Sequence, residues 1–228
     1  MTDAADIFKQ SYWDRPAPRD QGDQGPERIY RAVGYGLSQW ELADQALANL
    51  FIQFAFPADN GSSLSYDVTR RAYGSFFGNA GRRGAIDVAA EVFFENHWEN
   101  RVVRQWIKDI INAFQWGSIL RDDIAHGVAR AHRITITGNT YDFGTFHLPP
   151  DYNTGRTNLR GDGGGTSAPH TTARYRYVGE DIENIAHRFN VLRDVTQDRA
   201  STIYRVFDDG GGVSDLVKVI VDGQGEKR

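Results

Sequence analysis

The stretch VRQWIKDIINAFQWGSILRDDIAHG, residues 103–127, decides the fold. Its apolar side chains recur at steps of three and four residues, at Val103, Trp106, Ile107, Ile110, Phe114 and Gly117. That period predicts an amphipathic helix that begins near Asn100 and buries one face. Continued along the chain, the same period reaches Arg121 and then Ile124 and Ala125. An arginine therefore lies where an apolar residue is expected, at the end of a bundle helix.

The segment RDDIAHG, residues 121–127, combines two side chains that suit phosphodiester chemistry. An arginine can hold and neutralise a phosphate through its planar fork of donors. A histidine can move a proton near neutral pH, taking it from a ribose 2′-hydroxyl or returning it to the leaving oxygen. Together the two side chains are a minimal set for cleaving a phosphodiester without a metal ion, in which Arg121 would stabilise the charge on phosphorus and His126 would transfer the proton.

The spacing of these two residues sets a geometric condition. Five residues at about 100° each place two side chains of an unbroken helix roughly 140° apart. A shared site therefore requires a helix break at Asp122–Asp123, a second protomer that completes the site, or both. Either aspartate can serve as the N-cap of a new helix. In the alternative reading, Arg121 pairs with a buried acid such as Asp44, and His126 caps a helix end.

A second amphipathic pattern predicts a helix over residues 27–56, and Asp44 interrupts its apolar stripe between Trp40 and Leu47. A carboxylate on a buried stripe should be paired. Alternatively, the helix rotates slightly and Asp44 meets water at the edge of the core. Both readings stay open at this point.

Two shorter helices are expected over residues 64–77 and 85–98. Their predicted inward side chains are Val68, Ala72, Phe76, Val88, Ala89, Val92 and Phe93. Another long helix is expected over residues 180–207, where the apolar spacing returns, and it should end at the glycines 210–212.

After Arg133 the pattern changes to alternation, which predicts a short hairpin over residues 134–146 that turns at Gly138–Asn139. A long loop rich in glycine and proline follows, and then a short strand over residues 174–177. Alternation would put Arg174 and Arg176 on one face of that strand and two tyrosines on the other. RNA-binding surfaces use such side chains, and so does an ordinary edge strand with charged outer positions.

These patterns predict a mainly α fold. We expect a four- to five-helix up-down bundle, with a short β-hairpin and a long loop inserted before the last long helix. The expected organisation is a flexible N-terminal arm over residues 1–26, a bundle over 27–207 that contains the insertion 134–178, and a C-terminal tail over 208–228.

Composition excludes several classes of function. The 228 residues contain no cysteine, so disulfides, thiol catalysis and cysteine-ligated metals are ruled out. The histidines show no metal-ligand spacing, and we expect neither a metal nor another cofactor. No apolar run approaches membrane-spanning length and the acidic N-terminus does not read as a signal peptide, so no membrane contact and a cytoplasmic location are expected. The net charge of -4 requires any nucleic-acid contact to use a local patch.

The chain resembles the HEPN domains of prokaryotes. Their motif is an arginine, four to six residues of which the first is polar, and a histidine, and it is matched here by Arg121, Asp122 and His126. The run IAHG is similar to that of many such proteins. Further similarity extends over residues 27–195 and is carried by Trp40, Asp44, Leu47, the segments LPPDYNT (148–154) and YRY (175–177), Asp181, Ile182 and Phe189.

The resemblance implies a bundle that forms a homodimer, with the two motifs facing each other across the interface. It also implies a metal-independent endoribonuclease that acts on RNA as a toxin with an antitoxin protein as partner, or as a phage-defence effector. Arg121 and His126 would be catalytic, Asp122 would orient them, and Asp44 and Asp123 would support them. Val128 occupies the position where one branch has a tyrosine that a partner enzyme modifies, which puts that form of control in doubt.

Two alternatives remain. Some members of the family have lost activity, so the same bundle could be a non-catalytic module for dimerisation or protein interaction. A third reading is a nucleic-acid-binding accessory that does not cleave.

Overall fold

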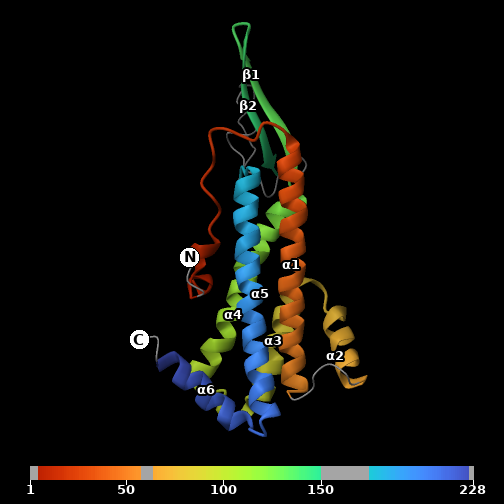
Figure 1. The fold of residues 1–228 in the computed structure, drawn as a ribbon, viewed down its shortest axis with the longest axis vertical. Coiled ribbons are helices and arrows are strands. Elements are labelled where there is room, and N and C mark those ends of the chain that lie inside the picture. The colour runs from red at the N-terminus through yellow and green to blue at the C-terminus, as the bar shows by residue number, and fades with distance from the viewer. Residues whose placement is uncertain (1–4, 58–63, 150–174, 226–228) are drawn as a thin grey trace. The chain divides into compact units, whose positions relative to one another are not determined.

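The structure is a computed structural model that describes residues 5–57, 64–149 and 175–225. Within these residues the fold is mainly helical, with a two-stranded antiparallel hairpin before the last long helix, as predicted (Figure 1). The α-helices are α1 (Pro26–Ala55), α2 (Leu64–Ser75), α3 (Gly78–Phe93), α4 (Arg101–His126), α5 (Gly179–Asp208) and α6 (Val213–Gly225). The remaining elements are the strands β1 (Val128–Ile136) and β2 (Asn139–Leu148) and the 3-10 helices η1 (Asp6–Phe8), η2 (Gln10–Trp13) and η3 (Glu95–His97).

The ends of the long helices follow local signals. Helix α1 begins at Pro26, and proline suits the first helical position because the amide hydrogen that it lacks would have no partner there. Just beyond α5, Gly210 has a φ of +79°, the left-handed conformation that commonly terminates helices. These signals explain why the predicted helices over 27–56 and 180–207 agree closely with α1 and α5.

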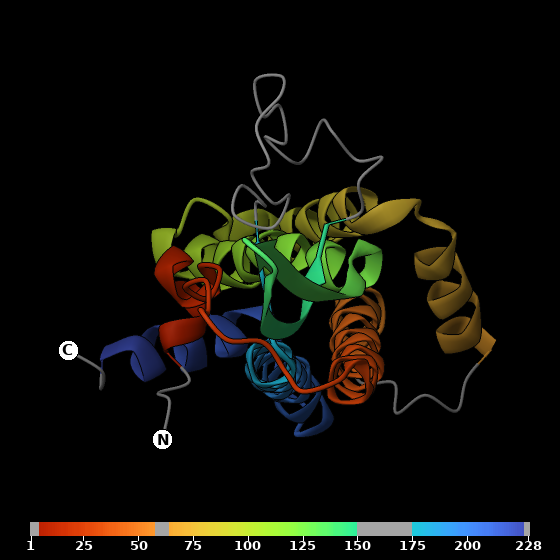
Figure 2. The same cartoon turned by 90° about the horizontal axis from the view of Figure 1, so that it is seen from above.

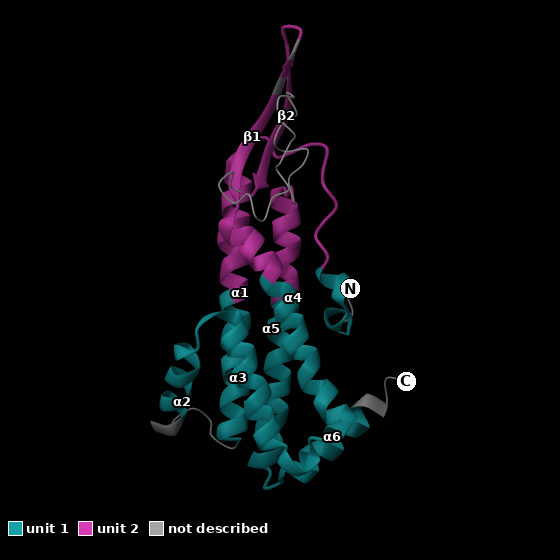
Figure 3. Cartoon of the chain, turned by 180° about the vertical axis from the view of Figure 1, so that it is seen from behind, with its two compact units in different colours: residues 1–13, 41–118, 190–228 teal, residues 14–40, 119–189 magenta. Residues whose placement is uncertain are grey.

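The chain divides into two compact units (Figure 3). Unit 1 contains residues 1–13, 41–118 and 190–228, and unit 2 contains residues 14–40 and 119–189. Helices α1, α4 and α5 each contribute residues to both units.

In unit 2, the first part of α1 packs against the last turns of α4 and the first turns of α5. A Cβ added at Gly36 would lie 3.5 Å from the Ile124 side chain and 3.6 Å from that of Ile182. Trp40 packs edge-on against Phe189, with ring centroids 5.1 Å apart. These contacts bury the apolar faces of the three helices and hold the end of α4.

The hairpin of unit 2 begins earlier than predicted. β1 starts at Val128, two residues after α4 ends, and pairs with β2 from Val128 opposite Leu148 to Ile136 opposite Asn139. The two turn residues are Thr137 and Gly138, with φ of +48° and +83°. Positive φ at both positions is typical of the tight turns whose twist matches a hairpin. The turn therefore lies one residue before the predicted Gly138–Asn139.

The segment predicted to be a flexible arm makes regular hydrogen bonds in unit 2. The Asp23 amide donates to the Thr145 carbonyl at 2.9 Å, and the Thr145 amide donates back at 2.7 Å, so the arm lies beside β2 before it enters α1 (Figures 1 and 2). The Asp23 carboxylate accepts from the Gly179 amide at 2.6 Å, where α5 begins. In unit 1, residues 6–13 form η1 and η2 and bury Ile7 and Trp13.

Two predicted inward stripes in unit 1 are wrong. On α2, Val68 is 59% exposed, and Tyr73 is buried instead. On α3, Val88 and Val92 are 62% and 70% exposed, whereas Ile86 and Ala90, and Phe94 just after the helix, are buried. Helix α3 has two apolar faces. The face predicted to be inward is exposed, and the other face is packed against the protein. The exposed valines line an apolar groove of about 520 Å³ whose floor includes Phe51 and Phe54.

The predicted C-terminal tail contains helix α6. Its buried side chains Leu216, Val217 and Ile220 recur at one- and four-residue spacing, the pattern of one helix face. In the parts of the chain that the structure describes, no helix combines the length and the apolar character needed to cross a membrane.

Candidate functional site

Arg121 and His126 both lie in the last turns of α4, in unit 2. The helix is continuous from Arg101 to His126, so Asp122 and Asp123 are interior helical residues and not N-caps. The helix break offered as one way to a shared site is absent. Since an unbroken helix separates the two side chains by roughly 140° around its axis, joining them in one site requires a second protomer.

Arg121 is half-buried, and it keeps unused hydrogen-bonding capacity. Its Nη1 contacts the Asp122 carboxylate at 3.2 Å. Its Nε is buried and has no hydrogen-bond partner among the described residues. A guanidinium group carries five N–H donors, so the single contact with Asp122 leaves several of them without a protein acceptor among the described residues.

His126 is exposed at the end of α4. Within the described residues its ring makes no hydrogen bond to a protein group. In the alternative prediction, His126 caps the helix end. In the structure a different histidine, His147, contacts the carbonyls there.

Asp123 anchors the end of α4 to the arm and to the segment before α5. Its buried carboxylate accepts hydrogen bonds from Arg15 Nε at 2.7 Å and Nη2 at 3.2 Å, and from the Tyr177 hydroxyl at 3.0 Å. Burial raises the pKa of Tyr177, and the negative charge of Asp123 raises it further, so the phenol stays a donor. Although burial alone would lower the pKa of Arg15, the hydrogen bond and charge of Asp123 raise it.

His147 on β2 satisfies backbone carbonyls in the last turn of α4. Its Nε2 lies 3.2 Å from the Asp123 carbonyl and 3.1 Å from the Ile124 carbonyl, and the Tyr175 hydroxyl donates to the Asp123 carbonyl at 2.8 Å. Helix ends leave carbonyls short of intrahelical partners, and the Asp123 carbonyl additionally accepts from the Gly127 amide at 3.1 Å. Burial lowers the pKa of His147 despite these acceptors, so the ring is neutral and carries its hydrogen on Nε2.

Gly127 is explained by this cap. A Cβ at position 127 would lie 2.2 Å from His147 Nε2, far inside van der Waals contact. The glycine of the IAHG run therefore lets the imidazole approach the helix end. Together, the Asp123 and His147 contacts fix the last turn of α4 and so the position of His126.

The segment Tyr175–Tyr177 turns both of its tyrosines into the protein. Both tyrosine rings are buried and stacked on each other with centroids 4.9 Å apart, and their hydroxyls are bonded to Asp123. Arg176 lies over the Phe146 ring at 5.2 Å and 3.9 Å from Asp20. Tyr177 forms an isolated bridge with His147. Arg174 and the rest of residues 150–174, where a long loop was predicted, lie outside the described residues.

Asp44 belongs to unit 1 and is buried and paired, so the reading in which it meets water at the edge of the core is wrong. It accepts a hydrogen bond from the Tyr73 hydroxyl at 3.0 Å and forms an ion pair with Arg82 Nη1. Burial raises the pKa of Tyr73, and the charge of Asp44 adds to the effect. Asp44 and Arg121 therefore do not pair with each other. Asp44 pairs with Arg82, and Arg121 contacts Asp122.

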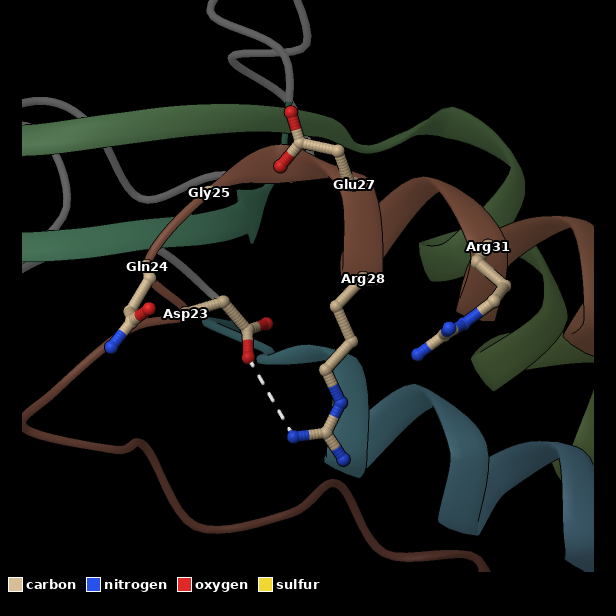
Figure 4. Close-up of a pocket in the computed structure, with 6 residues that line it drawn as sticks. All are labelled: Asp23, Gln24, Gly25, Glu27, Arg28 and Arg31. Atoms are coloured by element: carbon tan, nitrogen blue, oxygen red, sulfur yellow. Dashed lines mark ion pairs between the residues drawn. The ribbon is translucent and has the colours of Figure 1, made fainter.

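A polar cavity of about 430 Å³, which no sequence pattern predicted, lies where the arm enters α1 (Figure 4). Arg28 and Asp23 extend toward each other there, with 3.8 Å between Nη1 and Oδ1, and Arg28 also binds Glu183 at 2.8 Å. Arg31 makes neither a hydrogen bond nor an ion pair within the described residues. The positive charge of Arg28 is thus largely neutralised by Asp23 and Glu183.

Comparison of the chain with models of protein families, with curated proteins and with solved structures finds no match.

Proposed function

We propose that this protein is an endoribonuclease of the HEPN type, in which Arg121 and His126 act at the interface of a homodimer. One observation carries the proposal: Arg121 is a half-buried cation with a buried Nε that lacks an acceptor among the described residues. A purely structural arginine would use its donors on a buried acid. Among the described residues the buried acids are Asp44, Asp123 and Asp181, and they are held by Arg82, Arg15 and Arg19.

The second support is the placement of His126. A proton-transferring histidine must reach the substrate, and His126 is exposed on a helix end that Asp123 and His147 hold in place. Rigid support of this kind keeps a reacting group within the narrow range of positions that catalysis tolerates.

The chemistry follows from the two side chains. His126 takes the proton of a ribose 2′-hydroxyl while the 2′-oxygen forms a bond to phosphorus. The bond from phosphorus to the 5′-oxygen breaks, and the imidazolium returns its proton to that oxygen. Arg121 donates hydrogen bonds to the non-bridging phosphate oxygens, on which negative charge increases in the transition state. The products are a 2′,3′-cyclic phosphate and a 5′-hydroxyl.

Because an unbroken α4 directs the two side chains apart, each site combines Arg121 of one copy with His126 of the other. A two-fold axis then creates two equivalent sites. An antitoxin that covers the end of α4 or blocks dimerisation would suppress activity.

The test is cleavage of single-stranded RNA by the purified protein, beside His126→Ala and Arg121→Ala. Matched controls are His187→Ala and Arg31→Ala, which remove an exposed histidine and an exposed arginine of unit 2. We expect the cleavage rate of His126→Ala and Arg121→Ala to fall at least about a hundredfold, the scale of general acid–base catalysis. The two control variants should cleave at the wild-type rate. RNA with a 2′-deoxy sugar at the cleaved bond should resist.

Equal cleavage by all five proteins, or cleavage by none of them, would contradict the proposal. The non-catalytic alternative makes the opposite prediction for Arg121→Ala, which would then lower the melting temperature because the half-buried side chain would serve only packing and its contact with Asp122. An unchanged melting temperature with lost cleavage supports the enzyme.

A further inference from the structure

A second cavity, in unit 1, has the character of a ligand site. It has a volume of about 290 Å³, at the small end of the range for ligand pockets. Its polar lining comes from α1, α2 and α5, namely Asn49, Gln53, Tyr66, Gln197, Ser201 and Tyr204.

The lining is a polar strip within a helix contact. Asn49 and Gln53 are four residues apart on α1, and Gln197 and Ser201 are four residues apart on α5, so each pair occupies one helix face. The two faces meet where Asn49 Nδ2 donates to Gln197 Oε1 at 2.9 Å. Gln197 is exposed and Asn49 and Ser201 are half-buried, so the strip reaches the surface. Gln53 is its one buried member.

Gln53 is the strongest sign that the cavity is built to bind something. Its side chain is only 8% exposed, and its Oε1 is buried with no hydrogen-bond partner among the described residues. No other hydrogen bond of its amide is found within those residues either. A buried amide without partners lowers stability, and a ligand that hydrogen-bonds to it would remove that cost.

The side chains also define the chemistry of the ligand. None of the described residues that line the cavity is charged, which favours an uncharged ligand. Amide groups offer donors and acceptors side by side and pair with the edges of nucleobases. Tyrosine rings provide surfaces on which bases stack.

We propose that this cavity binds an uncharged purine or pyrimidine base, free or as its nucleoside, through Gln53 and its neighbours. The proposal is independent of the ribonuclease chemistry, because the cavity contains no residue of the α4 end. Failure of the ribonuclease proposal would therefore leave this proposal intact, and failure of this proposal would leave the ribonuclease proposal intact.

The experiment titrates the full-length protein with adenine, guanine, cytosine and uracil, and with their four nucleosides, by calorimetry. We expect saturable binding of at least one of them, and the tighter member of each base–nucleoside pair identifies the form recognised. Gln53→Leu should weaken binding at least tenfold. It should also raise the melting temperature of the unliganded protein, because it replaces an unpaired buried amide by an apolar group of similar size. The matched control Gln45→Leu changes an exposed glutamine of α1 in unit 1 and should leave binding unchanged.

A purely structural role for Gln53 would show as a lower melting temperature with unchanged affinity. Should Gln53→Leu fail to fold, Ser201→Ala decides, because it removes one polar group of the lining and should also weaken binding. The proposal is overturned if no base or nucleoside binds at millimolar concentration, or if neither variant changes affinity. It is also overturned if a neutral sugar such as glucose binds in a Gln53-dependent way and the bases do not.

Discussion

Asp44 in unit 1 and Asp123 in unit 2 are two buried carboxylates held in the same manner. Each accepts one hydrogen bond from a tyrosine hydroxyl at 3.0 Å and pairs with one arginine. The partners are Tyr73 and Arg82 for Asp44, and Tyr177 and Arg15 for Asp123. In both places burial raises the pKa of the tyrosine, so the phenol donates and the carboxylate accepts.

The two sites differ in where their partners come from and in what they hold. Asp44 is bound by residues 29 and 38 positions away, on the next two helices. Asp123 is bound by residues 54 and 108 positions away, and His147 caps the carbonyls beside it. The same arrangement therefore stabilises helix packing in unit 1 and fixes the end of α4 in unit 2. A buried acid paired with an arginine is thus a means of support, and in the proposed enzyme Asp123 would serve His126 as a positioning residue.

Replacing either aspartate should have the largest effect on stability. Asp44→Ala and Asp123→Ala each leave an arginine and a phenol without their acceptor, and breaking a buried pair costs about 3–5 kcal/mol. Denaturant unfolding measures both. At a temperature where both variants are folded, only Asp123→Ala should slow RNA cleavage. Normal cleavage by Asp123→Ala would show that the anchor does not position His126.

The tyrosine hydroxyls separate the hydrogen bonds from the ion pairs. Tyr73→Phe and Tyr177→Phe each remove one bond to a charged group, which contributes about 1.5–3 kcal/mol. We expect similar losses of unfolding free energy from the two variants. A loss at only one of the sites would break the parallel between them.

A substitution at Gly127 tests the contact between His147 and the end of α4, a feature that the Asp44 site lacks. Gly127→Ala places a methyl group against the His147 ring, and such overpacking costs about 1–3 kcal/mol. Gly34→Ala is the control, because position 34 of α1 has open space and alanine is favoured over glycine in a helix by about 0.5–1 kcal/mol. Thermal melts should shift in opposite directions. A tolerated Gly127→Ala would argue against close contact with the imidazole.

The pH dependence of stability tests the same cap. Burial lowers the pKa of His147 below 6.5, so the unfolded chain binds this proton more readily than the folded chain. Stability should therefore fall as the pH drops below about 6.5, by at most about 1.4 kcal/mol per pH unit for one proton. His147→Gln keeps a donor near the carbonyls but cannot titrate, so its unfolding free energy should fall less steeply between pH 6.5 and 5. Parallel slopes would assign the effect to other groups.

The sequence predicted what depends on local periodicity. The long helices and the alternation of the hairpin follow from spacing of apolar residues, and α1 and α5 agree closely with expectation. Helix α3 shows the limit, because both of its faces carry apolar side chains and only packing decides that Val88 stays exposed. Helix α6 could have been found from the spacing of Leu216, Val217 and Ile220.

The candidate site was predictable only in part. The motif located Arg121 and His126 on the end of a bundle helix. The residues that hold this helix end, Arg15 in the arm and His147 on β2, lie far from it in the sequence. No local pattern links either of them to Asp123. The tyrosines 175 and 177 alternate as a strand would, yet both turn inward because their hydroxyls bind Asp123. Long-range hydrogen bonds of this kind have no signature in a single sequence.

The central claim, that Arg121 and His126 act together across two copies of the chain, is tested most directly by mixing two inactive variants. Arg121→Ala and His126→Ala are each expected to lack RNA cleavage while keeping the wild-type melting temperature. After subunit exchange, half of the dimers in an equal mixture are mixed, and each has one complete site, so about a quarter of the wild-type activity should return. Cleavage by either variant alone, or an exchanged mixture that stays inactive, would contradict the account.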